Sequence, residues 1–545
     1  MNDFDDISFP TNGTQIENEY KTRKDSFKEW WYYFRVNILQ AAIVFDKQFR
    51  VGQMFDIVMR MNETSDRNIR WFHLTIEIIG VPLLTSFISL FVGAISDYWP
   101  GRKGRRSSMM LWALIPYLIG CYFFISSGIY PCVFFWDNEI RSRDDVFFKI
   151  GITSYCVGYV FWGIGVNLIS VMFRSYILDE FDTTQQDKVN LVKSFMTGVG
   201  YVLSYGIFFV FSLFTFNWNS ANDTSTINNA SDSMNGLFQE DITLLKRGGS
   251  VITMIFAFFS CFFEVAGVFY FIHVTKEQKY IASELTDQPR TKKECIKQSP
   301  KNVLSGFKAI NYGIFGIFIV VFFGWIDWGS FIDNFLGMNR NFLYPGRDNV
   351  DLRFLIFEFN FTFIGILIMI ESIVLYVTKW RLDKFTTISF FICALTTVML
   401  YFIQPSTETT EIMWFNYLHA SIPFFCATLI LTALKSFPYS LMRDTVPEDK
   451  HGVIMGIMNI FINIGQSTAF LIDIVLEASH NNVTKEEDEK DHPINSYIFI
   501  NALCIMSTVV SVIFRFIRKS SRNDGFEELK QNLNDSKELF DDIDN

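Results

Sequence analysis

Long apolar runs recur along the whole 545-residue chain, and short polar segments separate them. A helix of roughly 20 apolar residues crosses the hydrocarbon core of a bilayer. Lipid offers no partner for free backbone groups, so such runs must be helical. The pattern predicts an all-α membrane protein with twelve transmembrane helices, at residues 33–58, 72–95, 108–128, 147–176, 190–214, 249–274, 308–335, 354–378, 385–404, 413–437, 452–476 and 495–517.

Composition supports this class. Half of the residues are hydrophobic and 19% are charged, below the usual quarter for soluble domains. The net charge of −10 comes without a long basic stripe, so no nucleic-acid partner is expected. Eight cysteines lie mostly inside apolar runs and form no CxxC pair, which argues against a metal site or a disulfide framework. The chain has no HExxH and no Walker lysine loop, so ATP-driven transport by this chain alone is not expected. We expect neither an enzyme nor a cofactor.

A polar, lysine-rich segment at 275–307 divides the predicted helices into six plus six. We therefore expect an N-terminal tail at 1–32, a six-helix bundle at 33–274, a linker at 275–307, a second bundle at 308–517 and an acidic tail at 518–545. Asp187-Lys188 precedes the fifth helix and Asp449-Lys450 precedes the eleventh. Corresponding positions in two halves suggest repeats related by an axis along the membrane normal.

Lysine and arginine predict the orientation. The N-terminal tail, the 96–107 turn, the 275–307 linker and the 379–384 turn are basic and fall on one side, which is then cytoplasmic together with both termini. The first 29 residues are polar, so the first helix is expected to act as an internal anchor. We expect the plasma membrane, with a vesicular or lysosomal membrane as the alternative. Glycosylation sequons fall in the outer loops at Asn62, Asn222, Asn229 and Asn482.

The turn between the second and third predicted helices is the most informative segment. It runs from Ser96 to Arg106 and combines one acid with four basic residues. Gly104 permits a tight bend, and Asp97 can pair with Arg105 or Arg106 or cap the next helix. We interpret the turn as a gate latch, while a purely topological signal remains the alternative.

Charged residues inside the other helices predict a polar pathway, because a charge at mid-bilayer costs about 2.5–3.5 kcal/mol on insertion scales. Asp46 precedes Arg50 by four residues, a favourable pairing order. Arg174 and Asp179 lie about 140° apart on one helix, so each should find partners elsewhere. Alternatively, the first helix, with Asp46 and Arg50, lies partly at the membrane interface. For the other two residues, the alternatives are that Arg174 extends its charge to the membrane surface and that Asp179 only ends its helix.

Further polar residues complete this pathway. Arg353 opens the eighth helix, where it is expected to meet Asp327 or Asp333, and Asn459 and Gln466 share one face of the eleventh helix. Such amides can bind a sugar or bridge helices. The remaining intramembrane carboxylates are Glu264, Glu358, Glu371 and Asp473. About half of the intramembrane acids are expected to join helices instead of lining the pathway.

Four segments carry a family resemblance: Ser96-Asp97 through Gly104-Arg105-Arg106, Arg174 through Asp179, Trp325 through Asp333 to Gly337, and Met455-Gly456 through Asn459 to Gln466. Together they resemble the eukaryotic sucrose/proton symporters of the major facilitator superfamily. That family includes the animal proton-associated sugar transporters and is similar to the glycoside-pentoside-hexuronide:cation symporters. Asn334 stands where the family usually has an aspartate, and the family's earlier fourth-helix acid has no counterpart in this chain.

The resemblance implies a major facilitator fold with two pseudo-symmetric six-helix halves. It also implies secondary active transport of sucrose or a related glycoside or hexose, coupled to protons, by alternating access. Sugar rings would stack on Trp325, and Asp46, Asp179 and Asp333 would be the ranked proton carriers. The expected partners are the sugar, the proton and the bilayer, with a monomeric chain. An uncoupled carrier of another small solute and a non-transporting receptor are the alternatives.

Overall fold

The computed structural model describes residues 27–50, 80–101, 104–134, 144–215, 257–275, 291–341, 350–403, 414–443, 445–483 and 497–518. Side chains are described for most of these residues, although those of 127–152, 211–215, 333–357 and most of 470–483 are not. Helices make up the secondary structure of this part of the chain, as the long apolar runs predict.

The first half contains six helices within the described residues. They are a helix over 27–50, a helix over Ala257–Thr275, and α3 (Val81–Ser96), α4 (Arg105–Phe134), α5 (Asp144–Glu180) and α6 (Thr183–Thr215). The first two predicted spans correspond to 27–50 and α3, and the rest of their ranges lies outside the described residues.

The second half follows with its own set of helices. They are α9 (Tyr312–Asn341), α10 (Val350–Thr378), α11 (Leu382–Thr396) extended by the 3-10 helix Thr397–Phe402, α12 (Trp414–Met442), α13 (His451–Val483) and Tyr497–Arg518. Across both halves, ten helices of the described chain are long and apolar enough to span a membrane.

The bundle is apolar outside and partly polar inside. Large apolar side chains such as Phe258, Phe262 and Tyr122 are 59–65% exposed, whereas Asp46 and Arg106 are fully buried. Lipid tails favour apolar surface, and charges are tolerated only where protein or water surrounds them. This distribution is that of a membrane bundle with a polar interior.

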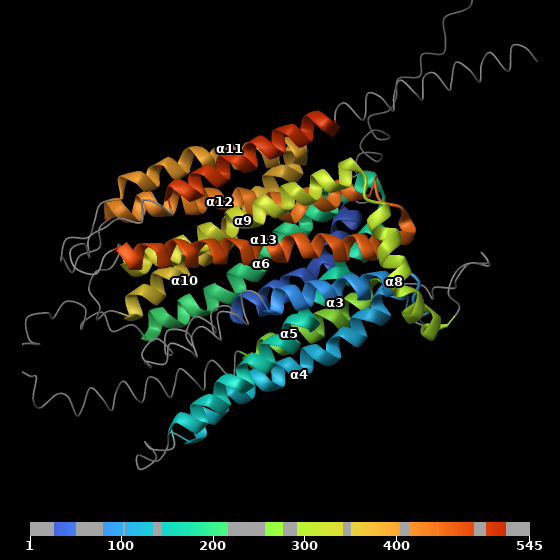
Figure 1. Ribbon diagram of the computed structural model, residues 1–545, viewed down its shortest axis with the longest axis horizontal. Coiled ribbons are helices and arrows are strands. Elements are labelled where there is room, and N and C mark those ends of the chain that lie inside the picture. Colours follow the sequence, from blue (N-terminus) through green and yellow to red (C-terminus); the bar gives the residue numbers. More distant parts are fainter. Residues whose placement is uncertain are drawn as a thin grey trace, which may run out of the picture.

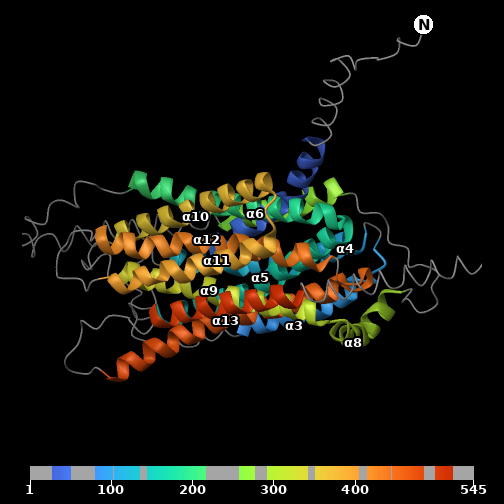
Figure 2. The same cartoon turned by 90° about the horizontal axis from the view of Figure 1, so that it is seen from above.

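Glycines bring the two halves into backbone contact along two seams. α3 lies beside α13, where a Cβ on Gly93 would come within 2.3 Å of the Gly452 carbonyl oxygen. α6 lies beside α10, where a Cβ on Gly198 would come within 2.5 Å of the Gly365 oxygen. Figure 2 shows the two pairs at opposite edges of the bundle, with α6 beside α10 at the top and α3 beside α13 at the bottom. Small residues permit such close helix packing in membranes.

The predicted polar linker contains a helix that its composition did not reveal. α8 (Lys292–Lys308) begins at a capping box in which Thr291 and Glu294 exchange side chain–backbone hydrogen bonds of 3.3 and 3.1 Å. The α8 residue Ser299 donates to the Phe91 carbonyl at 3.3 Å, so the helix packs on the end of α3. Figure 1 shows α8 across the same end of the bundle.

Candidate functional site

The turn from α3 to α4 places acidic and basic side chains at one end of the bundle. Asp97 is the residue that ends α3, and α4 begins at Arg105. Gly104 has φ of 92°, a left-handed conformation that glycine adopts without strain. The prediction of a glycine bend before the two arginines is therefore confirmed.

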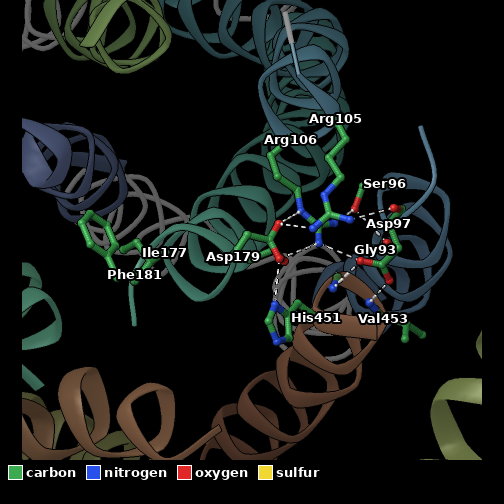
Figure 3. A network of polar contacts seen from close by, with 12 residues as sticks. Gly93, Ser96, Asp97, Arg105, Arg106, Ile177, Asp179, Phe181, His451 and Val453 are labelled. Carbon is green, nitrogen blue, oxygen red and sulfur yellow. Dashed lines mark hydrogen bonds and ion pairs between the residues drawn. The ribbon is translucent and has the colours of Figure 1, made fainter. Parts of the chain in front are cut away.

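Arg106 joins two carboxylates through its guanidinium group (Figure 3). Its Nη2 lies 2.7 Å from Asp97 Oδ1, and its Nε lies 2.8 Å from Asp179 Oδ2. Arg105 Nη2 adds a 3.0 Å contact to Asp179 and its Nη1 donates to the Asp97 carbonyl at 3.0 Å. Ser96 also contacts Arg106. The end of α5 is thus tied to the turn through its aspartate.

The same carboxylates reach across to the second half. Asp97 accepts hydrogen bonds from the backbone amides of Gly452 at 2.7 Å and Val453 at 3.0 Å. His451 Nδ1 lies 2.7 Å from Asp179 Oδ1. The first amides of a helix lack partners within it and carry partial positive charge, so a carboxylate there is favourable. Asp97 therefore caps α13, a helix of the other half, and not the next helix in the chain.

We call this group the inter-half charge network, which consists of Asp97, Arg105, Arg106, Asp179 and His451 with the α13 amides. Arg106 is fully buried, and the Asp97 side chain is 1% exposed. Burial raises the pKa of Asp97, and the nearby charges of Arg106 and Arg105 oppose that rise. Sequence reasoning found four of the five residues but missed His451. The Asp449-Lys450 repeat pointed to this helix start, but it did not indicate contact with Asp179.

A second polar group lies within the first half. Arg50 Nη2 is 3.2 Å from Asp46 Oδ1, which confirms the predicted pairing of these two residues. Trp162 Nε1 donates to Asp46 Oδ2 at 2.6 Å, and the Arg50 guanidinium lies 4.6 Å from the Phe124 ring centre. Glu264, fully buried, interacts electrostatically with Asp46. Of these two acids, Asp46 is the one that forms an ion pair with the buried Arg50 among the described residues.

A third polar group lies where the two halves meet. Arg174 Nη1 donates to Asn459 Oδ1 at 3.5 Å, which confirms that Arg174 finds its partner on another helix. Asn459 Nδ2 in turn lies 3.5 Å from Ser89 Oγ on α3. Lys193 Nζ lies 3.3 Å from the Tyr439 ring centre. These contacts connect α5 and α6 of the first half with α12 and α13 of the second.

Two lysines of this group escaped sequence reasoning. Lys193 and Lys435 fall near the ends of predicted spans five and ten, where a lysine normally marks the membrane surface. In the fold, Lys193 is 2% exposed, and Lys435 Nζ lies 4.8 Å from the Trp325 ring centre. Only the packing of the two halves reveals that these side chains face protein.

Other predicted residues remain apart from these groups. Asp327 is fully buried beside Ser507, and no basic side chain pairs with it among the described residues. Gln466 lies two turns beyond Asn459 on α13 and is half-buried. Asp333 lies in α9 and Arg353 in α10, but their side chains are outside the described part, so their expected meeting stays a prediction.

Sequence reasoning also missed an amide that joins the halves. Asn463 Nδ2 donates to Ser86 Oγ at 2.8 Å and lies 3.4 Å from the Pro82 carbonyl on α3. It lies one turn beyond Asn459, so both amides contribute to the α3–α13 seam. Of the predicted glycosylation sites, Asn482 lies in the last turn of α13, and Asn62, Asn222 and Asn229 lie outside the described residues.

The fold and these sites define a helical membrane carrier with two halves in contact through one charged end and a polar middle. The family sequence model of the Major Facilitator Superfamily matches residues 72–470, and the chain therefore belongs to this family. Membership confirms the predicted fold class and a transport protein rather than an enzyme.

One curated relative is the general alpha-glucoside permease of Schizosaccharomyces pombe, 30% identical over 187 residues. That match covers 33% of this chain and 31% of the permease, so this chain spans about a third of the relative's length.

Solved structures show the same fold at low identity. The proton:xylose symporter XylE bound to 6-bromo-6-deoxy-D-glucose has a TM-score of 0.53 at 14% identity, with 88% of this chain and 95% of that chain covered. FucP in the outward conformation has a TM-score of 0.53 at 11% identity, covering 89% and 98%. A bacterial homologue of ferroportin in the outward-facing state reaches 0.54 at 11%, covering 89% and 99%.

Proposed function

We propose that this protein is a secondary active transporter that moves a sugar by alternating access, coupled to protons. The observation that carries the proposal is the contact of Asp97 with the first amides of α13, because it joins the two halves at one end. We assign this end to the cytoplasm, in agreement with the basic turn that contributes Arg105 and Arg106.

The inter-half charge network can open without breaking a covalent bond. Water can replace Asp97 at the α13 amides, while Arg106 keeps both of its carboxylates within the first half. His451 would leave Asp179 together with α13. A closed and an open inner end are therefore both chemically reasonable states, as alternating access requires.

The sugar assignment draws on two independent similarities. Four motifs resemble the sucrose/proton symporters, and the partial relative is named as an alpha-glucoside permease. The third polar group offers the chemistry that a hydroxylated solute needs, because Arg174 and Asn459 present hydrogen-bonding groups and Trp325 presents a ring. We propose sucrose or a related glycoside or hexose as cargo.

Proton coupling would use a carboxyl group that can gain and lose a proton as the halves move. Asp46 is the first candidate because it is fully buried beside Arg50 and a second acid, Glu264. Asp179 is the second, since its contacts span both halves. Asp333 is the third, by resemblance. A membrane potential of about 100 mV supplies about 2.3 kcal/mol per charge.

The topology belongs to the same proposal. Both termini would be cytoplasmic, with bundles at 33–274 and 308–517 joined by the 275–307 linker, in a monomer at the plasma membrane. The sequons at Asn62, Asn222, Asn229 and Asn482 would then face outside.

Uptake of radiolabelled sucrose, maltose and glucose in transporter-deficient yeast, at several external pH values, tests the function. We expect uptake that rises on acidification and disappears when the proton gradient is collapsed. Uptake unchanged after the collapse would identify an uncoupled facilitator. No uptake of any solute by protein shown to reach the surface would favour a receptor.

The Asp179→Asn variant tests the coupling itself. We expect sugar-induced alkalinisation of the medium, normalised to the amount of surface protein, to disappear. Undiminished alkalinisation would remove Asp179 from the proton pathway.

A further inference from the structure

Four basic side chains from four helices gather between the two halves. Arg174 and Lys193 both lie against the Tyr439 ring, at 5.5 and 3.3 Å from its centre. Lys435 lies one turn before Tyr439 on α12, so it is near Arg174 and Lys193. Lys47 is close enough to Arg174 and Lys435 for their charges to repel one another. Three of the four bases come from the first half and one from the second. We call this group the basic cluster.

Acidic side chains do not balance this charge within the described residues. None of the four bases forms an ion pair in that part of the chain, and only Lys47 interacts with acids, namely Asp46 and Glu264. Asp46 already pairs with Arg50. Counting Arg50, five cations stand against two carboxylates, which leaves an excess of three positive charges when all are ionised.

Aromatic rings and amides supply only part of what these cations need. Lys193 has the Tyr439 ring and a 2.7 Å hydrogen bond to Asn190, and Lys435 has the Trp325 ring. A cation–π contact contributes about 0.5–2 kcal/mol, whereas removing an ion from water costs several kcal/mol. Lys193 and Arg174 are 2% and 9% exposed, so bulk water does not make up the difference for these two bases, whereas Lys47 and Lys435 are half-buried.

The neighbouring polar groups suit a hydroxylated ligand. Trp325 is 5% exposed and its indole N–H has no hydrogen-bond partner among the described residues. The Asn459 amide accepts a hydrogen bond from Arg174 and donates one to Ser89. A buried donor without a partner costs free energy, and a ligand hydroxyl or oxyanion would supply the missing acceptor.

We propose that the cargo of this carrier is an anion, a hydroxylated solute that bears a carboxylate or a phosphate, and that its charge binds to the basic cluster. This inference rests on the proposed transport function and adds a negative charge to the glycoside or hexose proposed there as cargo. Lysine and arginine both bind such oxyanions, arginine through two parallel hydrogen bonds. The anion would neutralise bases from both halves at once, so its binding would favour their approach.

The test uses the purified full-length protein in two assays. Thermal melting in detergent measures binding, and labelled uptake into proteoliposomes measures transport. The probes are D-glucuronate, D-glucose 6-phosphate, inorganic sulfate, D-glucose and sucrose. We expect glucuronate or glucose 6-phosphate to raise the melting temperature more than the two neutral sugars do, and to be carried faster than they are. Comparison of glucuronate with glucose 6-phosphate separates a carboxylate site from a phosphate site, and sulfate tests whether charge alone suffices.

Variants separate binding from folding. Lys193→Met removes a buried charge and Lys435→Met a half-buried one, and neither base has an acidic partner among the described residues. We therefore expect the ligand-free protein to melt at the same or a higher temperature. In these variants the apparent affinity for the anion, measured from the rise in melting temperature, should fall at least about tenfold, which corresponds to about 1.4 kcal/mol. Lys435→Arg should retain it. Lys188→Met is the matched control on α6, because Lys188 pairs with Glu29 and is 44% exposed.

The outcomes distinguish this inference from the proposed function. Transport of sucrose or glucose with no response to either acidic probe would overturn the anion inference and leave the sugar carrier in place. Transport of an acidic probe alone would support the inference and exclude a neutral-sugar carrier. Anion binding that persists in both methionine variants would also overturn the assignment to the basic cluster.

Discussion

The Gly93 and Gly452 backbones touch where α3 ends and α13 begins, and each glycine leaves the space that the other's carbonyl group occupies. A Cβ on Gly452 would lie 2.4 Å from the Gly93 oxygen and 2.7 Å from Asp97 Oδ1. The contact therefore allows the Asp97 carboxylate to reach the α13 amides. Helix packing and the inter-half charge network depend on the same pair of glycines.

Gly452→Ala should prevent this end of the bundle from closing. The new methyl group meets a backbone oxygen that cannot move without shifting a whole helix. We expect this clash to destabilise the closed state by at least about 1.4 kcal/mol, so the uptake rate should fall more than about tenfold. Initial rates of labelled uptake, normalised to surface protein, measure the effect.

Gly206→Ala is the control for that prediction. Its Cβ would lie 3.6 Å from the nearest Thr362 atom, which is an ordinary contact. Equal loss of uptake in the two variants would show that glycine substitution in any helix disturbs the protein, and that the α3–α13 contact has no special role.

Asp97→Asn should weaken the closed end while leaving the helices intact. The amide keeps one acceptor oxygen, but Arg106 loses a charged partner at 2.7 Å and one α13 amide loses its acceptor. Hydrogen bonds to charged groups contribute about 1.5–3 kcal/mol, so the open population should rise at least about tenfold.

A native cysteine can report this opening. Cys295 on α8 is fully buried, and its Sγ lies 3.2 Å from the Tyr98 carbonyl beside the network. In a variant that retains only this cysteine, Asp97→Asn should accelerate maleimide labelling of Cys295. Glu29→Gln, a change of an acid that pairs with Lys188 away from the network, should leave the labelling rate unchanged.

Apolar periodicity and charge predicted most of the fold but only part of the site. The twelve runs and the α3–α4 turn are local properties, so the sequence shows them directly. By contrast, Asp97 accepts hydrogen bonds from α13 amides, and His451 contacts Asp179. Both contacts join residues more than 270 positions apart in the chain. Lys193 and Lys435 show the same difficulty, because a lysine near the end of a span has the same local sequence whether it faces the membrane surface or the opposite half.

Arg106 and Asp179 should show strong coupling in a double-mutant cycle. Arg106 Nε lies 2.8 Å from Asp179, and removing one partner of a buried ion pair costs about 3–5 kcal/mol. We expect Arg106→Gln and Asp179→Asn each to lower the melting temperature of the purified protein, and the double variant to lower it by less than the sum. Strictly additive effects would show that Arg105, His451 and Asp97 hold the network without this pair.

Asp46 and Arg50 allow the stability of the first half to be separated from proton coupling. Asp46→Asn leaves the Arg50 guanidinium buried with the Phe124 ring and Cys121 as neighbours, so we expect a marked loss of thermal stability. The double variant Asp46→Asn/Arg50→Gln removes the unpaired charge and should regain most of that loss. If Asp46 carries the proton, the double variant will still take up substrate down its gradient but will show no substrate-induced alkalinisation. Alkalinisation at the wild-type rate in this stable double variant would exclude Asp46 and direct attention to Glu264, which is buried beside it.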